Sequence, residues 1–353
     1  MMQEVLRQVI SDAVWAPSGD NSQPWKFCIE ENKIYVFNLP DRDHPYLNFQ
    51  QGGSYIAHGA LIENARIAAA NRGYLTQVQL FPYSADSNLV ARLTLEPSSQ
   101  KHEFLYEAIF KRCTNRRPYK NTLLSSEQKN RLIDSVREVG NGTVRFIDTM
   151  RGMKPLAEAA SVMERIALEI PYLHHLFFAN ILWTKKEEEM KKCGLYLKSL
   201  ELPPPAQFLL HVLKRWSTMQ ILNKIGFSKI VAKGNSRIYT SSAAIGIIAE
   251  PAVTPINFIE AGRLMQRVWL CATAMGLSVQ PITGVLFLAQ RLFAGEDNLL
   301  SNFQKQLVKD AYRTVEQGFR LKQDVPILLF RIGYGDPPSA RSSRLPPTVN
   351  EAS

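Results

Sequence analysis

Apolar and polar residues alternate along this chain in two rhythms, which predicts helices and strands mixed along its length. Residues 3–14 repeat their apolar side chains at the spacing of an amphipathic helix. The runs Trp25–Glu30 and Lys33–Leu39 alternate instead, and they predict an antiparallel hairpin that turns at Glu31-Asn32. Further runs predict strands over 77–81, 89–95, 243–249 and 325–332, and helices over 285–293 and 299–315.

Two long stretches, 54–72 and 258–276, are apolar on nearly every side, which predicts helices that are buried on most faces. They also resemble each other, because the same interval of 14 residues separates two glycines in each. The pairs are Gly59 with Gly73 and Gly262 with Gly276. Two unrelated buried helices that end in glycine would share part of this likeness. We interpret it as internal duplication, and we expect the two helices to pack together at the centre of the molecule.

The duplication divides the chain into a first half, residues 1–100, and a second half, residues 101–353, with a weaker match between 9–13 and 132–136. Residues 151–234 have no partner in the first half, and we expect them to form a helical lid over a ligand site. The lid contains helix-like runs over 156–169, 187–200 and 208–225, and aromatic residues that look exposed, Tyr172, Phe177, Phe178 and Trp183. We interpret His174-His175 as a surface pair rather than a metal site.

Composition places the chain among soluble globular proteins, with 353 residues of which 45% are hydrophobic. Four widely spaced cysteines favour a reducing cytoplasm and indicate neither a zinc site nor a disulfide framework. No stretch is long and apolar enough to span a bilayer, and residues 1–15 do not read as a signal peptide. We therefore expect a cytoplasmic protein without a membrane partner.

Most of the formal charge of +10 is spread along the chain, and only two places of interest concentrate it. One is the run Lys111-Arg112 with Arg116-Arg117, and the other is the pair Arg341 and Arg344 in the C-terminal tail. Two small clusters of arginine suit a small phosphorylated ligand better than a nucleic acid.

A turn-rich loop, residues 16–25, follows the first helix and leads into the first strand. Its two prolines restrict φ, its glycine permits unusual backbone conformations, and its short polar side chains and free N–H groups suit ligand binding. An ordinary connection between a helix and a strand would have similar residue types. The chain contains no Walker loop, Rossmann glycine motif, nucleophile elbow or HExxH zinc motif.

Four runs together resemble the FMN-dependent nitroreductase family. The first is Ala16-Pro17-Ser18 with Asn21 and Gln23-Pro24-Trp25, similar to the flavin-contacting loop of that family. The others are Arg112-Cys113-Thr114-Asn115-Arg116, Gln280-Pro281-Ile282-Thr283-Gly284 and Arg341-Ser342-Ser343-Arg344-Leu345-Pro346. The resemblance implies an α+β nitroreductase-like fold with central sheets, buried central helices and bound FMN.

The resemblance also implies a role for each matching residue. Arg112, Arg341 and Arg344 would hold the FMN phosphate, with the Thr114 hydroxyl beside the phosphate or ribityl chain. Arg116 would lie near flavin N1 and O2, and the backbone amides of Thr283 and Gly284 would approach N5. Pro281 belongs to the same turn, Pro17, Ser18 and Asn21 would meet the other side of the ring, and Asn235 would be a further contact.

The order of the runs departs from the family pattern. In the family the arginine run precedes the Ala-Pro-Ser loop, and each flavin lies between two subunits, whereas here the order is inverted and each run occurs once. The resemblance therefore implies a fused pseudo-dimer with one working FMN site and one vestigial site, as in the duplicated, dormancy-associated branch. Thr283 stands where many members carry Glu.

The function implied is hydride transfer from NAD(P)H through the flavin to a small nitroaromatic or quinone-like acceptor. The alternative is a non-enzymatic protein that stores or senses FMN behind a closed lid. The fused pseudo-dimer is expected to be a monomer, and further self-association is left open.

Overall fold

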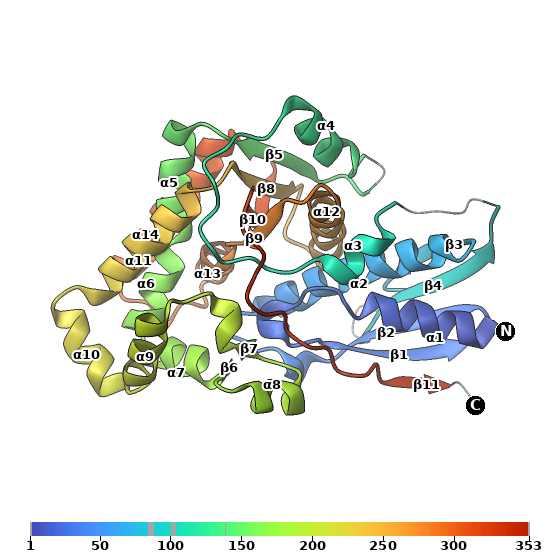
Figure 1. The fold of residues 1–353 in the computed structure, drawn as a ribbon, viewed down its shortest axis with the longest axis horizontal. Coiled ribbons are helices and arrows are strands. Elements are labelled where there is room, and N and C mark those ends of the chain that lie inside the picture. Colours follow the sequence, from blue (N-terminus) through green and yellow to red (C-terminus); the bar gives the residue numbers. More distant parts are fainter. Residues whose placement is uncertain (1, 84–87, 100–103, 138, 352–353) are drawn as a thin grey trace.

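The computed structural model describes residues 2–83, 88–99, 104–137 and 139–351. Two mixed layers of sheet and helix meet at a pair of central helices (Figure 1). The first sheet has the order β11-β1-β2-β4-β3, and all its pairs are antiparallel except β11 with β1. Its strands are β1 (Trp25–Glu30), β2 (Lys33–Asn38), β3 (Tyr74–Leu80), β4 (Leu89–Pro97) and β11 (Val349–Glu351).

The second sheet repeats the strand order of the first. It runs β5-β8-β10-β9 with every pair antiparallel, as in β1-β2-β4-β3. Its strands are β5 (Thr143–Ile147), β8 (Ala244–Glu250), β9 (Ser278–Pro281) and β10 (Val325–Gly333). A helix precedes each sheet and a longer one joins its second and third strands. These are α1 (Met2–Ala13) with α2 (Gly52–Asn71), and α4 (Ser126–Asp134) with α12 (Pro255–Ala274).

The central helices α2 and α12 pack directly on each other, as the sequence predicted. A Cβ placed on Gly59 would lie 2.0 Å from the carbonyl oxygen of Ile259, and one on Gly262 would lie 2.0 Å from that of Ile56. Glycine is required at both positions because the two backbones touch there. The two contacts are reciprocal, so the helices cross in the manner of a symmetric dimer interface.

Polar pairs beside the crossing have the same reciprocal arrangement. Gln266 donates a 2.6 Å hydrogen bond to Asn64, and Arg267 donates a 2.7 Å hydrogen bond to Glu63. Counted from the two central glycines, Glu63 corresponds to Gln266 and Asn64 corresponds to Arg267, so the two pairs are equivalent. Glu63 is fully buried and also pairs with Arg263 at 3.1 Å. A buried carboxylate therefore receives two guanidinium groups from the other half, which compensates for its desolvation.

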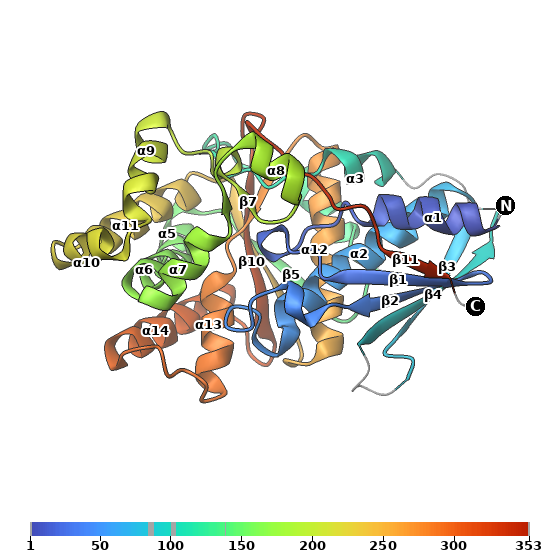
Figure 2. The same ribbon diagram turned by 90° about the horizontal axis from the view of Figure 1, so that it is seen from below.

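Two connections that contain no helix among the described residues of the first sheet, those between its first and second and between its third and fourth strands, contain helices in the second sheet. Between β5 and β8 they form a separate lobe at the end of the molecule away from both termini (Figures 1 and 2). The helices are α5 (Met150–Ala160), α6 (Val162–Glu169), α7 (Pro171–Ala179), α8 (Lys185–Lys191), α9 (Pro204–Leu213), α10 (Trp216–Lys224) and α11 (Phe227–Thr240). Strands β6 (Ile181–Leu182) and β7 (Leu195–Tyr196) pair within this lobe, α13 (Gly284–Phe293) and α14 (Asn302–Phe319) lie between β9 and β10, and α3 (Tyr106–Lys111) precedes the arginine run.

Several helix predictions for this lobe were wrong in extent. Helix α8 ends within the run 187–200 at Lys191, because Lys192 and Gly194 adopt left-handed backbone conformations. The chain then enters β7, and a short 3-10 helix follows over Leu197–Leu200. The run 156–169 belongs to two helices that meet at Ser161. The run 208–225 is interrupted between α9 and α10. Apolar periodicity alone did not reveal these interruptions.

His174 does not form a surface pair with its neighbour, because its side chain is buried. Its Nε2 lies 2.8 Å from the carbonyl oxygen of Leu213, and its ring packs on Phe178 and Trp216. Phe178, which looked exposed, is also buried. Both side chains belong to the small apolar core of the lobe, whose existence the sequence could not specify.

The C-terminal tail crosses the molecule from β10 and ends as β11 beside β1 (Figure 1). It therefore embraces the first half. The expected boundary between residues 100 and 101 lies outside the described residues. Within the described ranges, none of the helices combines the length and apolarity needed to traverse a bilayer.

Candidate functional site

The loop 16–25 holds an unusual backbone shape. Asp20, Asn21 and Gln23 have φ values of 46°, 57° and 51°, which residues other than glycine seldom adopt. Ser18 Oγ accepts a 2.9 Å hydrogen bond from the Gln23 N–H, and the Gln23 side chain donates to the Lys192 carbonyl over 2.7 Å. The surrounding structure therefore fixes a strained loop, which is typical of ligand-binding sites.

Three arginines from distant parts of the chain converge beside this loop. Arg112 follows α3, whereas Arg341 and Arg344 belong to the tail, and together they line a cavity of about 80 Å³. Arg112 donates to the Trp15 carbonyl over 2.9 Å, and Arg344 donates to Asn21 Oδ1 over 2.9 Å. The remaining lining residues include Pro17, Ser18, Thr114 and Arg116.

Within the described ranges the three guanidinium groups form no ion pair, although the charge of Glu188 acts on Arg344. In the described part of the chain, no carboxylate lies within 4 Å of Arg112, Arg341 or Arg344 in an ion pair, and their buried Nε atoms have no hydrogen-bond partner. Burial, and then the repulsion from Arg344 and Arg341, lowers the pKa of Arg112 well below its usual range. Burial likewise lowers the pKa of Arg344 to about 10. A bound anion would relieve both penalties.

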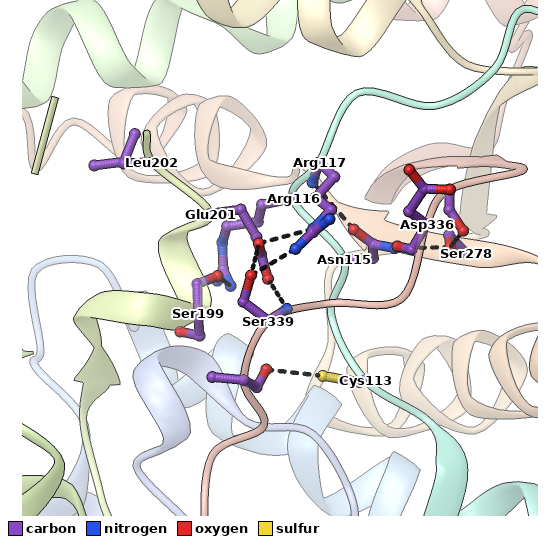
Figure 3. A network of polar contacts seen from close by, with 12 residues as sticks. Cys113, Asn115, Arg116, Arg117, Ser199, Glu201, Leu202, Ser278, Asp336 and Ser339 are labelled. Carbon is purple, nitrogen blue, oxygen red and sulfur yellow. Dashed lines mark hydrogen bonds and ion pairs between the residues drawn. The ribbon is translucent and has the colours of Figure 1, made fainter. Parts of the chain in front are cut away.

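Two carboxylates of the helical lobe hold the tail in place. Glu201 accepts hydrogen bonds from Arg117 Nε at 2.9 Å and Ser339 Oγ at 2.7 Å (Figure 3). Glu188 accepts from the Ser343 N–H at 2.6 Å and from its hydroxyl at 3.1 Å. These contacts position the tail arginines against the loop, so the lobe contributes to the site as a support as well as a cover.

A buried arginine, Arg331, holds the backbone of the arginine run 112–117 in place. Arg331 lies on β10, is fully buried, and donates to the Arg117 carbonyl at 2.8 Å and to Gln280 Oε1 at 2.7 Å. Its guanidinium stacks 3.9 Å from the centre of the Tyr119 ring. Arg331 was not among the predicted site residues, although a lone charge inside the apolar run 325–332 was a usable signal.

A second cavity of about 340 Å³ adjoins the first and shares Asp20, Arg116 and Leu195 with it. One wall is the turn Pro281 to Gly284, and helices α6 and α7 form the other. Gly284 begins α13, so its N–H has no acceptor inside the helix. A Cβ at this position would lie 2.5 Å from Met163 Cγ, so the lobe packs closely over the turn.

Carboxyl groups with raised pKa values line this second cavity. Burial, reinforced by the charge of Asp20, raises the pKa of Asp43 to about 7. Burial also raises the pKa of Asp20, whose Oδ2 accepts a 2.8 Å hydrogen bond from Asn180. Glu164 has a raised pKa for the same reason and accepts a hydrogen bond from Tyr239. The cavity can therefore hold protons near neutral pH.

His44 also lines the second cavity, as a neutral side chain. Burial, and then the positive charge of Arg291, lowers its pKa. Its Nδ1 accepts a 3.2 Å hydrogen bond from the Tyr46 N–H, which leaves the proton on Nε2, 3.1 Å from the Tyr172 hydroxyl. Tyr172 belongs to α7, so this hydrogen bond ties the lobe to the first half.

The structure brings together eleven of the twelve residues that the sequence proposed. Asn235 is the exception: it lies on α11 and lines neither cavity. The first cavity is lined by Pro17, Ser18, Asn21, Arg112, Thr114, Arg116, Arg341 and Arg344, and the second by Arg116, Pro281, Thr283 and Gly284. Asp20, Asp43 and Glu164 were missed, because lone carboxylates carry no signal until the fold makes them neighbours.

No protein-family model matches the chain. An uncharacterized protein of Mycobacterium tuberculosis, MT1398, is 26% identical over 343 residues, which cover 95% of this chain and 46% of that protein. The "Putative NAD(P)H nitroreductase acg" of the same species is 28% identical over 119 residues, 33% of this chain and 36% of that protein. The chain thus spans less than half the length of these curated relatives.

Among solved structures, the FMN-dependent nitroreductase NfnB from Mycobacterium smegmatis in complex with NADPH is 12% identical to this chain. The match covers 66% of this chain and 88% of that one, with a TM-score of 0.37. A score this low carries no argument about fold or function.

Proposed function

We propose that this chain is an FMN-binding oxidoreductase of the nitroreductase type. The observation that carries the proposal is the meeting of Arg112, Arg341 and Arg344 with the strained loop 16–25 at a cavity that continues into a second, larger one. The partial likeness to a protein named as an NAD(P)H nitroreductase supports the same reading.

The arginine cluster suits the phosphate end of FMN. Three guanidinium groups with unpaired, buried Nε atoms offer donors to phosphate oxygens, and the dianion would offset their mutual repulsion. Thr114 adds a hydroxyl to the same cavity. Ser18 and Asn21 are engaged with the loop and the tail, so they would shape the cavity more than contact the ligand.

The second cavity suits the ring end. When bound, FMN would supply hydride transfer between NAD(P)H and a small nitroaromatic or quinone-like acceptor. Arg116 would place positive charge at the junction of the two cavities, and the N–H groups at the start of α13 would donate to the ring. Asp43, which titrates near neutral pH, would hold a proton for the acceptor.

The chain would be a fused pseudo-dimer that arose by internal duplication. The matching strand orders and the reciprocal contacts of α2 and α12 support this part of the proposal. Because the arginine run and the basic tail each occur once, we expect one FMN per chain. The second, equivalent position would be vestigial, as in the dormancy-associated branch of the family.

A second candidate function is storage or sensing of FMN without turnover. The close packing of Met163 over Gly284 favours it, because helices α6 and α7 leave little room above the turn for a nicotinamide. The Thr283 hydroxyl is also occupied by the backbone of Leu329, because it donates to the Leu329 carbonyl over 3.0 Å and accepts from the Leu329 N–H over 3.2 Å.

Spectroscopy of the purified protein tests both candidates. We expect a flavin spectrum at one FMN per chain, and rapid anaerobic bleaching by NADPH or NADH for an oxidoreductase. Bleaching by dithionite but by neither nicotinamide would favour storage, and a protein that neither retains nor rebinds FMN would refute both. Met163→Ala is a useful companion, because it opens the lobe above the turn and should speed bleaching if access alone limits it.

A further inference from the structure

Helices α9, α10 and α11 present a surface that the proposed function does not use. This α9–α11 surface carries six of the large apolar side chains that are exposed in the described part of the chain. They are Phe208, Leu209, Val212, Ile221, Ile225 and Ile230, with exposed fractions of 73%, 38%, 43%, 65%, 76% and 65%. The pair at 208 and 212 on α9, and the pair at 221 and 225 at the end of α10, are each one helical turn apart, so each pair forms a short apolar stripe, and α11 adds one apolar side chain.

The same segment carries only positive charge. Residues 202–249 contain no aspartate or glutamate, whereas the helices contribute six cationic side chains. These are Lys214, Arg215, Lys224, Lys229, Lys233 and Arg237, all exposed. Residues 108–126 also lack acidic residues and carry five cations, but their arginines belong to the site already described. The α9–α11 segment combines its positive charge with exposed apolar side chains.

The surface lies at the far end of the helical lobe. In both views α10 is the element farthest from the two termini, with α9 and α11 beside it (Figures 1 and 2). Their inward side chains, among them Leu210, Leu213 and Met219, form the small core of the lobe. The exposed apolar side chains are not part of this core.

We propose that the α9–α11 surface docks on a bilayer that contains anionic phospholipid. Exposed apolar stripes between cationic side chains match the acyl and headgroup layers of such a membrane, where the apolar residues are buried and each cation is attracted to the negative surface. A second copy of the chain fits less well, because two such surfaces would bring twelve cations together. A nucleic acid would leave the apolar stripes without a partner.

This proposal modifies the sequence-based expectation that the protein has no membrane partner. That expectation considered segments that span a bilayer, and the helices described by the structure indeed include none of that kind. Peripheral docking needs only a surface, and the surface arises when three helices of modest hydrophobicity pack side by side. The lobe that docks also walls the second cavity through α6 and α7.

Cosedimentation of the full-length protein with vesicles tests the proposal. Vesicles of phosphatidylcholine with phosphatidylglycerol should bind the protein, those of phosphatidylcholine alone should bind it far more weakly, and added salt should reduce binding. Lys224→Gln with Lys229→Gln should lower the partition coefficient about fivefold per removed charge. Ile221→Ser with Ile225→Ser should abolish most of the remaining binding.

Matched variants outside the surface serve as controls. Leu123 is 61% exposed and Lys322 is exposed, and neither belongs to the lobe, so Leu123→Ser and Lys322→Gln should leave binding unchanged. Thermal unfolding of every variant checks that the lobe stays folded. Absence of binding to anionic vesicles would overturn the proposal. So would a dimer, formed without lipid, that Ile225→Ser dissociates, because the surface would then be an interface between copies.

Discussion

Replacing Arg344 with glutamine tests the contribution of the phosphate end of the site to FMN binding independently of the ring end. The side chain is one of three converging guanidinium groups, and its pKa is lowered to about 10, first by burial and then by Arg341. Keeping this charge inside the protein costs on the order of 3 kcal/mol relative to an ordinary arginine. Glutamine removes that cost. It also removes five hydrogen bonds, to Asn21 and to the carbonyls of Trp15, Ala16, Ser342 and Ser343, which share two nitrogen atoms and are worth about 0.5–1 kcal/mol each. The ligand-free stability should therefore change little.

The affinity for FMN should change much more. A hydrogen bond between a guanidinium and a phosphate contributes about 1.5–3 kcal/mol, so the Kd for FMN should rise about 10- to 150-fold. At an FMN concentration of one hundred times the wild-type Kd, stabilisation by the ligand would fall from about 2.7 kcal/mol to between about 0.3 and 1.4 kcal/mol.

Titration of flavin fluorescence with two ligands gives the decisive comparison. Riboflavin lacks the phosphate, so its Kd should be nearly the same for wild type and Arg344→Gln, whereas that of FMN rises. Arg131→Gln, which changes an arginine with a side chain 63% exposed on α4, should affect neither ligand. An FMN Kd within twofold of wild type, or an equal loss of riboflavin affinity, would refute the assignment of Arg344 to the phosphate.

Three further predictions concern stability. Gly59→Ala should cost about 3 kcal/mol or more in urea unfolding, because its Cβ would collide with the backbone of Ile259, whereas Gly234→Ala, where nothing lies within 4 Å, should stabilise α11 by about 0.5–1 kcal/mol. Because the pKa of Asp43 in the folded protein is raised to about 7, its contribution to folding stability is complete below about pH 4 and is lost as pH rises through 7. The urea midpoint of Asp43→Asn should therefore match that of wild type at pH 4 and exceed it at pH 8. For Glu63, burial opposes ionisation, but three arginines outweigh it and lower the pKa of the carboxyl group. The contribution of Glu63 to folding stability is therefore present above about pH 4 and is lost as pH falls further. Glu63→Gln should cost about 3 kcal/mol at pH 7, and an unchanged urea midpoint at that pH would contradict this assignment.

Much of the fold could be predicted from local pattern. The hairpin of β1 and β2, the strand β10 and the two glycine-containing central helices follow from periodicity and from where glycine ends a helix, which are properties of neighbouring residues. The lobe was predicted less well. His174 is buried because α6, α7 and α10 pack together, which outweighs the weak local signals there. The helices end at Ser161 and at Lys192 without a signal that apolar periodicity could reveal.

The sequence by itself determined which residues are available for a phosphate site, because arginine runs and a proline-framed loop are visible in one dimension. Only the tertiary structure decided that Arg112 and Arg344 meet the same loop, that Asn235 stands apart, and that Asp20 and Asp43 share a cavity. The physical reason is that a pKa shift, a cavity and a docking surface each depend on which side chains are neighbours in space, and that is fixed by long-range packing.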